Sequence, residues 1–205
     1  MKPGRPKVLD KTILAAKCYK IYWEKGINNV TYNDAIKYSG FSKFSFYKVF
    51  KNEDELHKET IKFYFDNYLN NIKNDIYEYN NVLKALSYFE KKSSVKNYKP
   101  CFFNICNSKK NELGTKAKKI LKKIEISYKK MFIDLINRHI KEYNLDNCKI
   151  NVEDLSAFLV HNFYLINILM LNKTSTKEIL IIKRYIKEIV TNELNYKKKD
   201  INHEI

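Results

Sequence analysis

The stretch TYNDAIKYSGFSKFSFYKVF, residues 31–50, places one glycine between two short segments rich in lysine and aromatic residues. Thr31 and Asp34 have the spacing of a capping box, in which each side chain accepts a hydrogen bond from the other residue's backbone N–H. A helix is therefore predicted over 32–39. Gly40 follows this segment and can adopt the left-handed conformation that ends a helix and reverses the chain.

A second helix is predicted over 43–50, because Ser42 can cap its first turn. Its apolar residues recur at helical spacing and are expected to point inward: Phe46, Val49 and Phe50. The other residues are expected to face outward: Lys43, Phe44, Ser45, Tyr47 and Lys48. Such a face suits DNA, because lysines can meet phosphates while rings lie against sugars and thymine methyls. Two short helices joined by a glycine turn predict a helix-turn-helix.

Capped helices are also predicted on both sides of this pair. Asp10 is a suitable N-cap for a helix that ends at Gly26, and this helix would brace the other two. Asn52 and Glu55 repeat the capping-box spacing at the start of a longer helix. The first 52 residues are therefore expected to form an arm and a three-helix DNA-binding domain.

The rest of the chain is expected to be helical as well. Only four glycines and three prolines occur in 205 residues, and 44% of the residues are hydrophobic, enough to form a core. Six further helices are predicted over 53–79, 81–91, 100–110, 113–143, 152–172 and 177–194. We therefore predict an all-α fold of about nine helices, with domains over 1–52 and 53–205.

Positive charge is concentrated at the N-terminus. The net charge is +16, and the first 51 residues hold 11 Lys or Arg against three acidic residues. This distribution favours an anionic partner such as DNA. Total charge alone is a weaker indication, because an AT-rich coding sequence would also produce a lysine-rich chain.

The first nine residues form a basic arm in which Pro3, Gly4 and Pro6 disfavour a helix. Its PGRPK segment resembles the Arg-Pro core of AT-hooks, so Arg5 is a candidate for insertion into a narrow minor groove. A disordered basic tail would have the same composition, and the sequence leaves both interpretations open.

The N-terminal motifs resemble those of the TetR family of bacterial transcriptional regulators over about 45 residues without a gap. The matching positions are Gly26, Val30-Thr31, Asp34-Ala35-Ile36, Ser39-Gly40-Phe41-Ser42, Phe46-Tyr47-Lys48-Val49-Phe50 and Asn52-Glu53-Asp54-Glu55-Leu56. The resemblance implies a homodimer that binds a palindromic operator in double-stranded DNA and responds to a small-molecule effector. Effector binding would move the helix that begins at Glu53 and change the separation of the recognition helices. Most members are repressors.

Specific DNA contacts follow from the same resemblance. It implies phosphate contacts for Thr31, Tyr32, Tyr47, Lys48 and Lys51, and an approach to base edges for Lys43, Phe44 and Ser45. Three positions depart from the family pattern. Ile36 replaces a small residue at the helix crossing, Phe44 replaces a glycine, and Glu53 stands where a phosphate-binding lysine is common.

The resemblance also implies a ligand cavity in the C-terminal domain. The PCFFNI segment, residues 100–105, is similar to a Gly-Cys-Leu-Leu segment found in many members. The candidate ligand-binding residues are Phe102, Phe103, Asn104, Tyr128, Phe132, His161 and Asn162. The side chain of His161 needs a polar partner, which could lie in the cavity or across a dimer interface.

The last two predicted helices are apolar over wide arcs and are expected to form the dimer interface. The residues behind this prediction are Phe158, Leu159, Phe163, Ile166, Leu169 and Met170 on one helix and Ile179, Ile182, Ile186, Ile189 and Val190 on the other. The apolar run over 157–171 contains a histidine and two asparagines, and is expected to be a buried helix too short to span a bilayer.

The sequence predicts no enzymatic site, metal site or cofactor. His57, His139, His161 and His203 are scattered, and no HExxH, GxSxG or phosphate-binding glycine loop occurs. Four widely spaced cysteines and the absence of a signal peptide indicate a cytoplasmic protein with free thiols. Whether Cys101 or Cys106 senses redox state is left open.

The sequence as a whole predicts a ligand-responsive DNA-binding regulator. Two alternatives remain, an effector-independent DNA-organising protein and a basic helical protein at a membrane surface. The first would show weak sequence preference, and the second would bind anionic vesicles.

Overall fold

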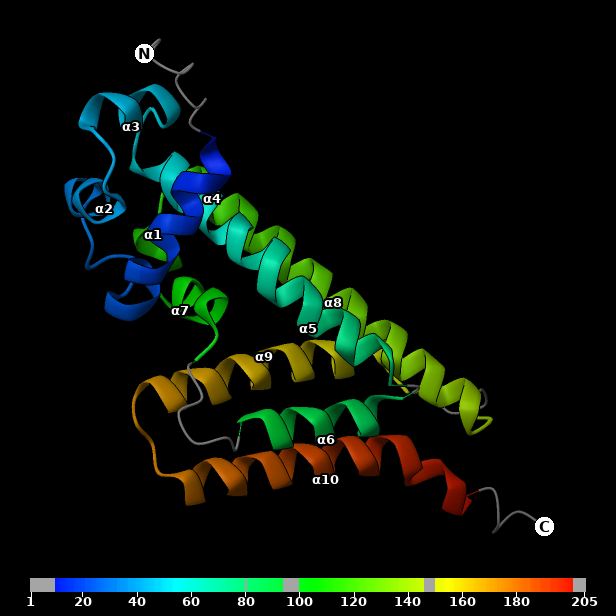
Figure 1. Cartoon of the computed structure of the whole chain (residues 1–205). Coiled ribbons are helices and arrows are strands. Elements are labelled where there is room, and N and C mark those ends of the chain that lie inside the picture. Colours follow the sequence, from blue (N-terminus) through cyan, green and yellow to red (C-terminus); the bar gives the residue numbers. More distant parts are fainter. Residues whose placement is uncertain (1–9, 80, 94–99, 146–149, 201–205) are drawn as a thin grey trace. The chain divides into compact units, whose positions relative to one another are not determined.

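A computed structural model of the chain describes residues 10–79, 81–93, 100–145 and 150–200, which are helical and contain no strand (Figure 1). The predicted all-α fold is confirmed. The chain divides into two compact units. The first, Met1–Leu69 with Ile105–Lys123, is called the N-terminal unit, and the second, Asn70–Asn104 with Ile124–Ile205, is called the C-terminal unit. The functional boundary after residue 52 stays a prediction.

The N-terminal unit is built on four helices, with α1 packed against α2 and α4. These helices are α1 (Lys11–Lys25), α2 (Tyr32–Ser39), α3 (Lys43–Val49) and α4 (Glu53–Tyr64). A π-helical turn (Phe65–Leu69), a 3-10 helix (Lys110–Glu112) and the start of α8 (Thr115–Glu142) complete it. Helices α1, α2 and α3 therefore begin where the sequence predicted.

Side-chain caps set these helix starts. The oxygens of Asp10, Thr31, Ser42 and Asn52 accept backbone N–H groups at 3.2, 3.2, 3.1 and 3.0 Å, respectively. Thr31 also donates its own backbone N–H to Asp34 at 3.2 Å, which completes the predicted capping box. Gly40 has a φ of 74°, in the left-handed region. Local hydrogen bonds thus define the helix-turn-helix.

Aromatic and aliphatic side chains fill the core of the N-terminal unit. Phe46 and Phe50 of the α3 segment are fully buried, as predicted, and Ile36 is buried as well. Burying a phenylalanine of this kind contributes about 2–3 kcal/mol. Other core residues are Leu14, Ala15, Cys18, Ile21, Tyr22, Ile27, Val30, Ala35, Leu56 and Ile61. Because the inner side of α3 is fixed in this core, its other side is held outward.

Asp54 ties the start of α4 to the start of α8. Its two carboxylate oxygens accept the backbone N–H groups of Lys116 and Ala117, both at 2.9 Å. These N–H groups lie in the first turn of α8, so Asp54 caps a helix distant from it in the sequence. Gly114 permits this approach, because a Cβ there would overlap the Asp54 side chain.

His57 is a buried histidine of α4. Its ring lies edge-on to that of Tyr22, with 5.1 Å between centroids, and its Nε2 atom has no hydrogen-bond partner among the described residues. Burial lowers the pKa of His57 from 6.5 to about 4, because the charged imidazolium would be desolvated. The folded state therefore favours the neutral ring.

We expect the free energy of unfolding to fall as the pH drops from about 6.5 to about 4. The unfolded chain then binds a proton that buried His57 resists, so the contribution reaches about 3 kcal/mol at the low end. Urea unfolding of wild-type protein and His57→Gln at pH 7 and pH 4.5 measures the difference. Equal pH slopes for wild type and His57→Gln would contradict the prediction.

The C-terminal unit is also helical (Figure 1). Its helices are α5 (Asn70–Tyr77), α6 (Val82–Ser93), the later part of α8, α9 (Val152–Leu171) and α10 (Thr176–Asp200), while α7 (Phe102–Ser108) begins in this unit. Helix α10 packs against α6 and α9. The core of the C-terminal unit contains these residues: Ile76, Val82, Leu86, Met131, Phe132, Leu135, Ile136, Leu159, Ile166, Ile186, Val190 and Leu194.

Helix α9 differs from the sequence prediction. It begins at Val152, and its 20 residues have a mean hydropathy of 1.4 over the most apolar window, so its length and composition are sufficient to cross a membrane. A core helix of a soluble protein meets the same criterion. Only 28% of that window is buried, and Leu165 and Leu171 are exposed. The helix is therefore apolar on both its packed side and its open side.

Candidate nucleic-acid interface

The outward side of α3 carries aromatic and basic side chains at the surface. Phe44 is 70% exposed and Tyr47 is 50% exposed, while Lys43 and Lys48 are also exposed. Ser45 is half-buried, because its hydroxyl and backbone lie against the Ser42 cap. The structure thus brings together the five predicted outward residues on one short helix.

Lys48 and Phe44 form a pair on this surface. The Lys48 Nζ atom lies 4.4 Å from the centre of the Phe44 ring, a cation–π contact between residues one helical turn apart. The ring leaves the ammonium group on the open side of the helix. A largely exposed phenylalanine is unfavourable in water, and it presents an apolar surface suited to sugars or thymine methyls.

Tyr32 positions α3 relative to α2. Its hydroxyl donates to the backbone carbonyl of Phe50 at 2.9 Å, and its ring makes edge contacts with Phe46 and Tyr47, both at 5.4 Å between centroids. Burial raises the pKa of Tyr32 to about 12. The hydroxyl proton is therefore used inside the protein, which differs from the phosphate contact that the resemblance implies.

Two of the other predicted phosphate contacts lie at helix ends. Thr31 is exposed, and its hydroxyl donates to Asp34 at 2.6 Å within the capping box. Lys51 is exposed, and its backbone N–H donates to Glu55 Oε2 at 3.0 Å. The hydrogen bonds that Glu55 accepts from Lys116 and from Lys51 lower its pKa to about 2. Glu55 thus stays ionised and fixes the backbone beside Lys51.

Two further features bear on this surface. Arg5, the candidate for the minor groove, lies outside the described residues. Tyr38 of α2 is 45% exposed, although the sequence analysis did not select it. It lies one helical turn after Asp34, which is exposed, so spacing from Asp34 would have placed it on the open side of α2.

The predicted ligand-binding residues all lie in the C-terminal unit. Phe102, Phe103 and Asn104 of α7 are buried. Phe103 stacks on Tyr128 with 6.1 Å between ring centroids, and Phe132 stacks on Phe163 at 5.4 Å. Their role in ligand binding stays a prediction.

The polar candidates on α9 are placed differently from the expectation. His161 is exposed rather than internal, and Asn162 donates to the Phe158 carbonyl of its own helix at 2.8 Å. Asn167 of the same helix is buried instead, and it accepts the Cys101 N–H and donates to the Phe163 carbonyl, both at 2.9 Å. Its place within an apolar run was the only sequence signal for this role.

Metal and thiol chemistry have little support in the described part of the chain. Within it, no group of three His, Cys, Asp or Glu residues is placed to hold a metal ion. Cys18, Cys101 and Cys106 are free thiols, and Cys18 and Cys106 are buried. Burial raises the pKa of Cys18 to about 12, which disfavours a reactive thiolate. Cys148 lies outside the described residues.

Comparison with known proteins finds similarity only at the level of structure. No family model and no curated protein matches the sequence. A TetR-family transcriptional regulator from Cytophaga hutchinsonii is similar with a TM-score of 0.77 and 10% identity, over 89% of this chain and 93% of that one. The reduced form of NemR from E. coli has a TM-score of 0.72 and 11% identity, over 87% and 96%.

A third similar structure contains DNA. It is a cysteine mutant of CifR, a TetR-family transcriptional regulator, complexed with a 26 bp double-strand operator. Its TM-score is 0.72 and its identity 12%, over 90% of this chain and 98% of that one. These three proteins share an all-helical fold with this chain along most of their length. The chain therefore has the fold of the TetR family of transcriptional regulators.

Proposed function

We propose that this protein is a DNA-binding transcriptional regulator. The observation that carries the proposal is the outward side of α3, where Lys43, Phe44, Tyr47 and Lys48 are exposed while Phe46 is buried. A short helix held in this way fits the major groove, which is about 12 Å wide. The operator complex of the similarly folded CifR supports the same use of the fold.

Each residue of this surface has a proposed role. Lys48 and Lys51 contact phosphates, and Tyr47 and Thr31 lie beside the backbone. Lys43, Phe44 and Ser45 approach base edges. Tyr32 positions α3 through its bond to Phe50. Arg5 reaches the minor groove from the arm.

We further propose that the protein acts as a homodimer on a palindromic operator. One short recognition helix makes too few contacts for specific binding, and paired helices about 34 Å apart would read successive major grooves. The open sides of α9 and α10 supply apolar surface for the interface. Ile181, Tyr185 and Ile189 of α10 are exposed at intervals of four residues, and Leu165 of α9 is exposed too.

This interface differs in detail from the one predicted. Ile179, Ile186 and Val190 of α10, and Leu159 and Ile166 of α9, are buried within the C-terminal unit. A single chain already buries these side chains. Of the other two residues predicted on α10, Ile182 is half-buried and Ile189 is exposed, so Ile189 remains for a partner together with residues that the sequence analysis did not select. The exposed position of His161 fits the dimer alternative for this residue better than the cavity alternative.

Effector response belongs to the same proposal. A small molecule would bind among the aromatic residues of the C-terminal unit and would favour one separation of the recognition helices over another. Repression of transcription, a cytoplasmic location and the lack of enzymatic activity complete the proposed function. An effector-independent DNA-organising protein is the alternative, because it would use the same α3 surface.

Selection from a pool of random DNA duplexes tests the function. We expect the full-length protein to enrich one sequence with twofold symmetry and half-sites about one helical turn apart. Enrichment of AT-rich DNA without a defined site would favour the DNA-organising alternative. Failure to retain any duplex at low salt would refute DNA binding.

A further inference from the structure

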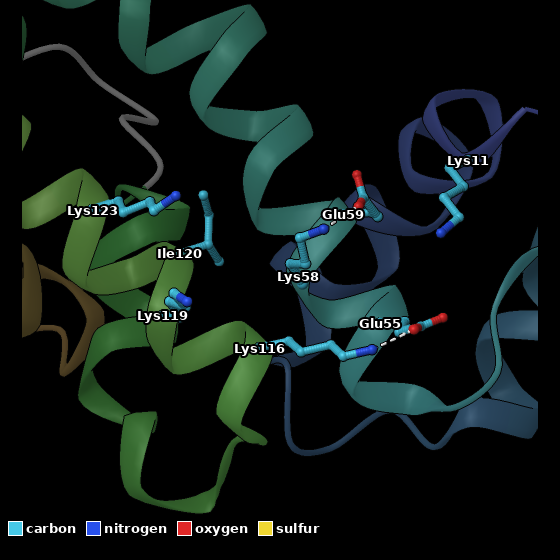
Figure 2. Close-up of a pocket in the computed structure, with 8 residues that line it drawn as sticks. All are labelled: Lys11, Glu55, Lys58, Glu59, Lys116, Lys119, Ile120 and Lys123. Carbon is cyan, nitrogen blue, oxygen red and sulfur yellow. Dashed lines mark hydrogen bonds and ion pairs between the residues drawn. The ribbon is translucent and has the colours of Figure 1, made fainter.

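A basic pocket lies within the N-terminal unit, apart from the outward side of α3. It has a volume of about 270 Å³ and is lined by Lys11 of α1, by Glu55, Lys58 and Glu59 of α4, and by Lys116, Lys119, Ile120 and Lys123 of α8. Figure 2 shows side chains of α4 and α8 on opposite sides of this space. It contains none of the predicted ligand-binding residues.

Charged side chains dominate the lining of this pocket. Five of its eight lining residues are lysines, two are glutamates and only Ile120 is apolar. Both glutamates are already paired, Glu59 with Lys58 at 2.7 Å and Glu55 with Lys116. Of the other three lysines, Lys11 lies close enough to Glu55 to help lower the pKa of that carboxyl. Lys119 and Lys123 have no carboxylate partner in the described part of the chain. With five lysines against two glutamates, two of these lysines being unpaired, the pocket carries net positive charge and attracts a multiply charged anion.

Helical spacing explains why these lysines converge. Lys116, Lys119 and Lys123 recur three and four residues apart, so they share one side of α8. Lys118 and Lys122 lie on the same helix, are exposed, and do not line the pocket. The basic residues of α8 therefore divide into a pocket set and a set outside it.

The pocket is connected to the predicted DNA surface through Glu55. Its Oε1 atom is bound by the Lys116 side chain, and its Oε2 atom accepts the backbone N–H of Lys51. An anion that attracts Lys116 would compete with Glu55 for this ammonium group. Release of Glu55 would then alter the backbone support of Lys51, one of the proposed phosphate contacts.

We propose that this pocket binds phosphate groups, and that a small polyphosphorylated molecule is the ligand. Phosphate oxygens are strong acceptors for several lysines at once, whereas a carboxylate would satisfy fewer of them. A phosphate of the DNA backbone has the same chemistry and is the other source. Anion binding itself does not depend on the proposed function, but its effect on DNA affinity rests on it.

Titration calorimetry with tripolyphosphate at 0.15 M salt tests the site. We expect saturable binding of one anion per chain, at least about tenfold weaker for Lys119→Gln/Lys123→Gln, since both unpaired charges are lost. Lys118→Gln/Lys122→Gln is the matched control, with the same charge change at the same spacing, and should bind as wild type does. Thermal unfolding checks that both variants fold. Equal weakening in the two variants would overturn the proposal.

A parallel titration with duplex DNA distinguishes the two sources of phosphate. If the ligand is a small molecule, tripolyphosphate binds wild type but not Lys119→Gln/Lys123→Gln. Both proteins then bind DNA with the same affinity when the anion is absent. If the pocket contacts the DNA backbone instead, DNA binding is weaker in Lys119→Gln/Lys123→Gln, and the tripolyphosphate titration does not saturate. This outcome would reject the small-molecule ligand. If neither titration distinguishes this variant from its control, the pocket does not bind phosphate. Wild-type protein that binds tripolyphosphate but does not bind DNA would contradict the proposed function alone.

Discussion

Replacing Lys48 and Lys51 by glutamate is expected to lower affinity for the selected duplex by roughly three orders of magnitude at 0.15 M salt. A dimer would lose four phosphate contacts, and each contact contributes about 0.9 to the slope of log K against log salt. The slope should therefore become shallower by about four. Fluorescence anisotropy of a labelled duplex over roughly 0.05–0.3 M salt measures both quantities.

The matched control for this variant is Lys130→Glu/Lys141→Glu. Both residues are exposed and belong to the C-terminal unit, so the control makes the same change in net charge outside the proposed surface. It should retain most of the affinity, because distant charges act only weakly at this salt. If both variants lose affinity equally, binding depends on total charge and not on α3. Folding is compared by circular dichroism, since neither site lies in a core.

Replacing Ile181 and Tyr185 by glutamate is expected to convert the protein from a dimer to a monomer. The two side chains are 40% and 53% exposed, so a single chain loses little by the change. In a helical dimer interface they would be buried, and each introduced carboxylate would then be desolvated without a partner. Sedimentation velocity at about micromolar concentration, where an interface of ordinary size remains associated, gives the oligomeric state.

The same variant also tests the link between dimerisation and DNA binding. We expect its affinity for the selected duplex to fall strongly, because a monomer presents one recognition helix instead of two. Lys130→Glu/Lys141→Glu again serves as the control and should stay dimeric. A wild-type protein that sediments as a monomer would contradict the proposed interface, whatever the behaviour of the variant.

The helix-turn-helix could be predicted accurately because its determinants are local. Thr31 with Asp34, and Ser42 with Ser45, lie within four residues of each other, and their hydrogen bonds occur as expected. Gly40 takes the backbone conformation for which glycine is favoured. The inward positions of Phe46 and Phe50 follow from helical spacing alone.

Features that join distant segments could not be predicted in this way. The basic pocket combines Lys11, Glu55 and Lys119, which lie on three different helices. The cap that Asp54 provides for α8 likewise depends on tertiary contact across more than sixty residues of sequence. Charge and spacing gave no sign that these groups meet.

The open side of the last two helices was the main error of detail. Both helices carry apolar residues around most of their circumference, so periodicity does not show which side a single chain buries. Packing with α6 and α8 buries Ile186 and Leu159 and leaves Tyr185 and Leu165 exposed. The apolar character of both helices was therefore predicted correctly, but several side chains expected at the interface are buried within a single chain. The dimer interface itself stays a prediction.

Hydrogen exchange of the backbone amides, with and without the selected duplex at saturating concentration, tests most directly whether α3 is the DNA-reading element. We predict that exchange slows in α2, in α3 and at Lys51, where bound DNA would exclude solvent and suppress local opening. Exchange on the α10 stripe of Ile181, Tyr185 and Ile189 should stay unchanged. Unaltered exchange in α3, with protection appearing elsewhere in the chain, would contradict the proposed mode of binding.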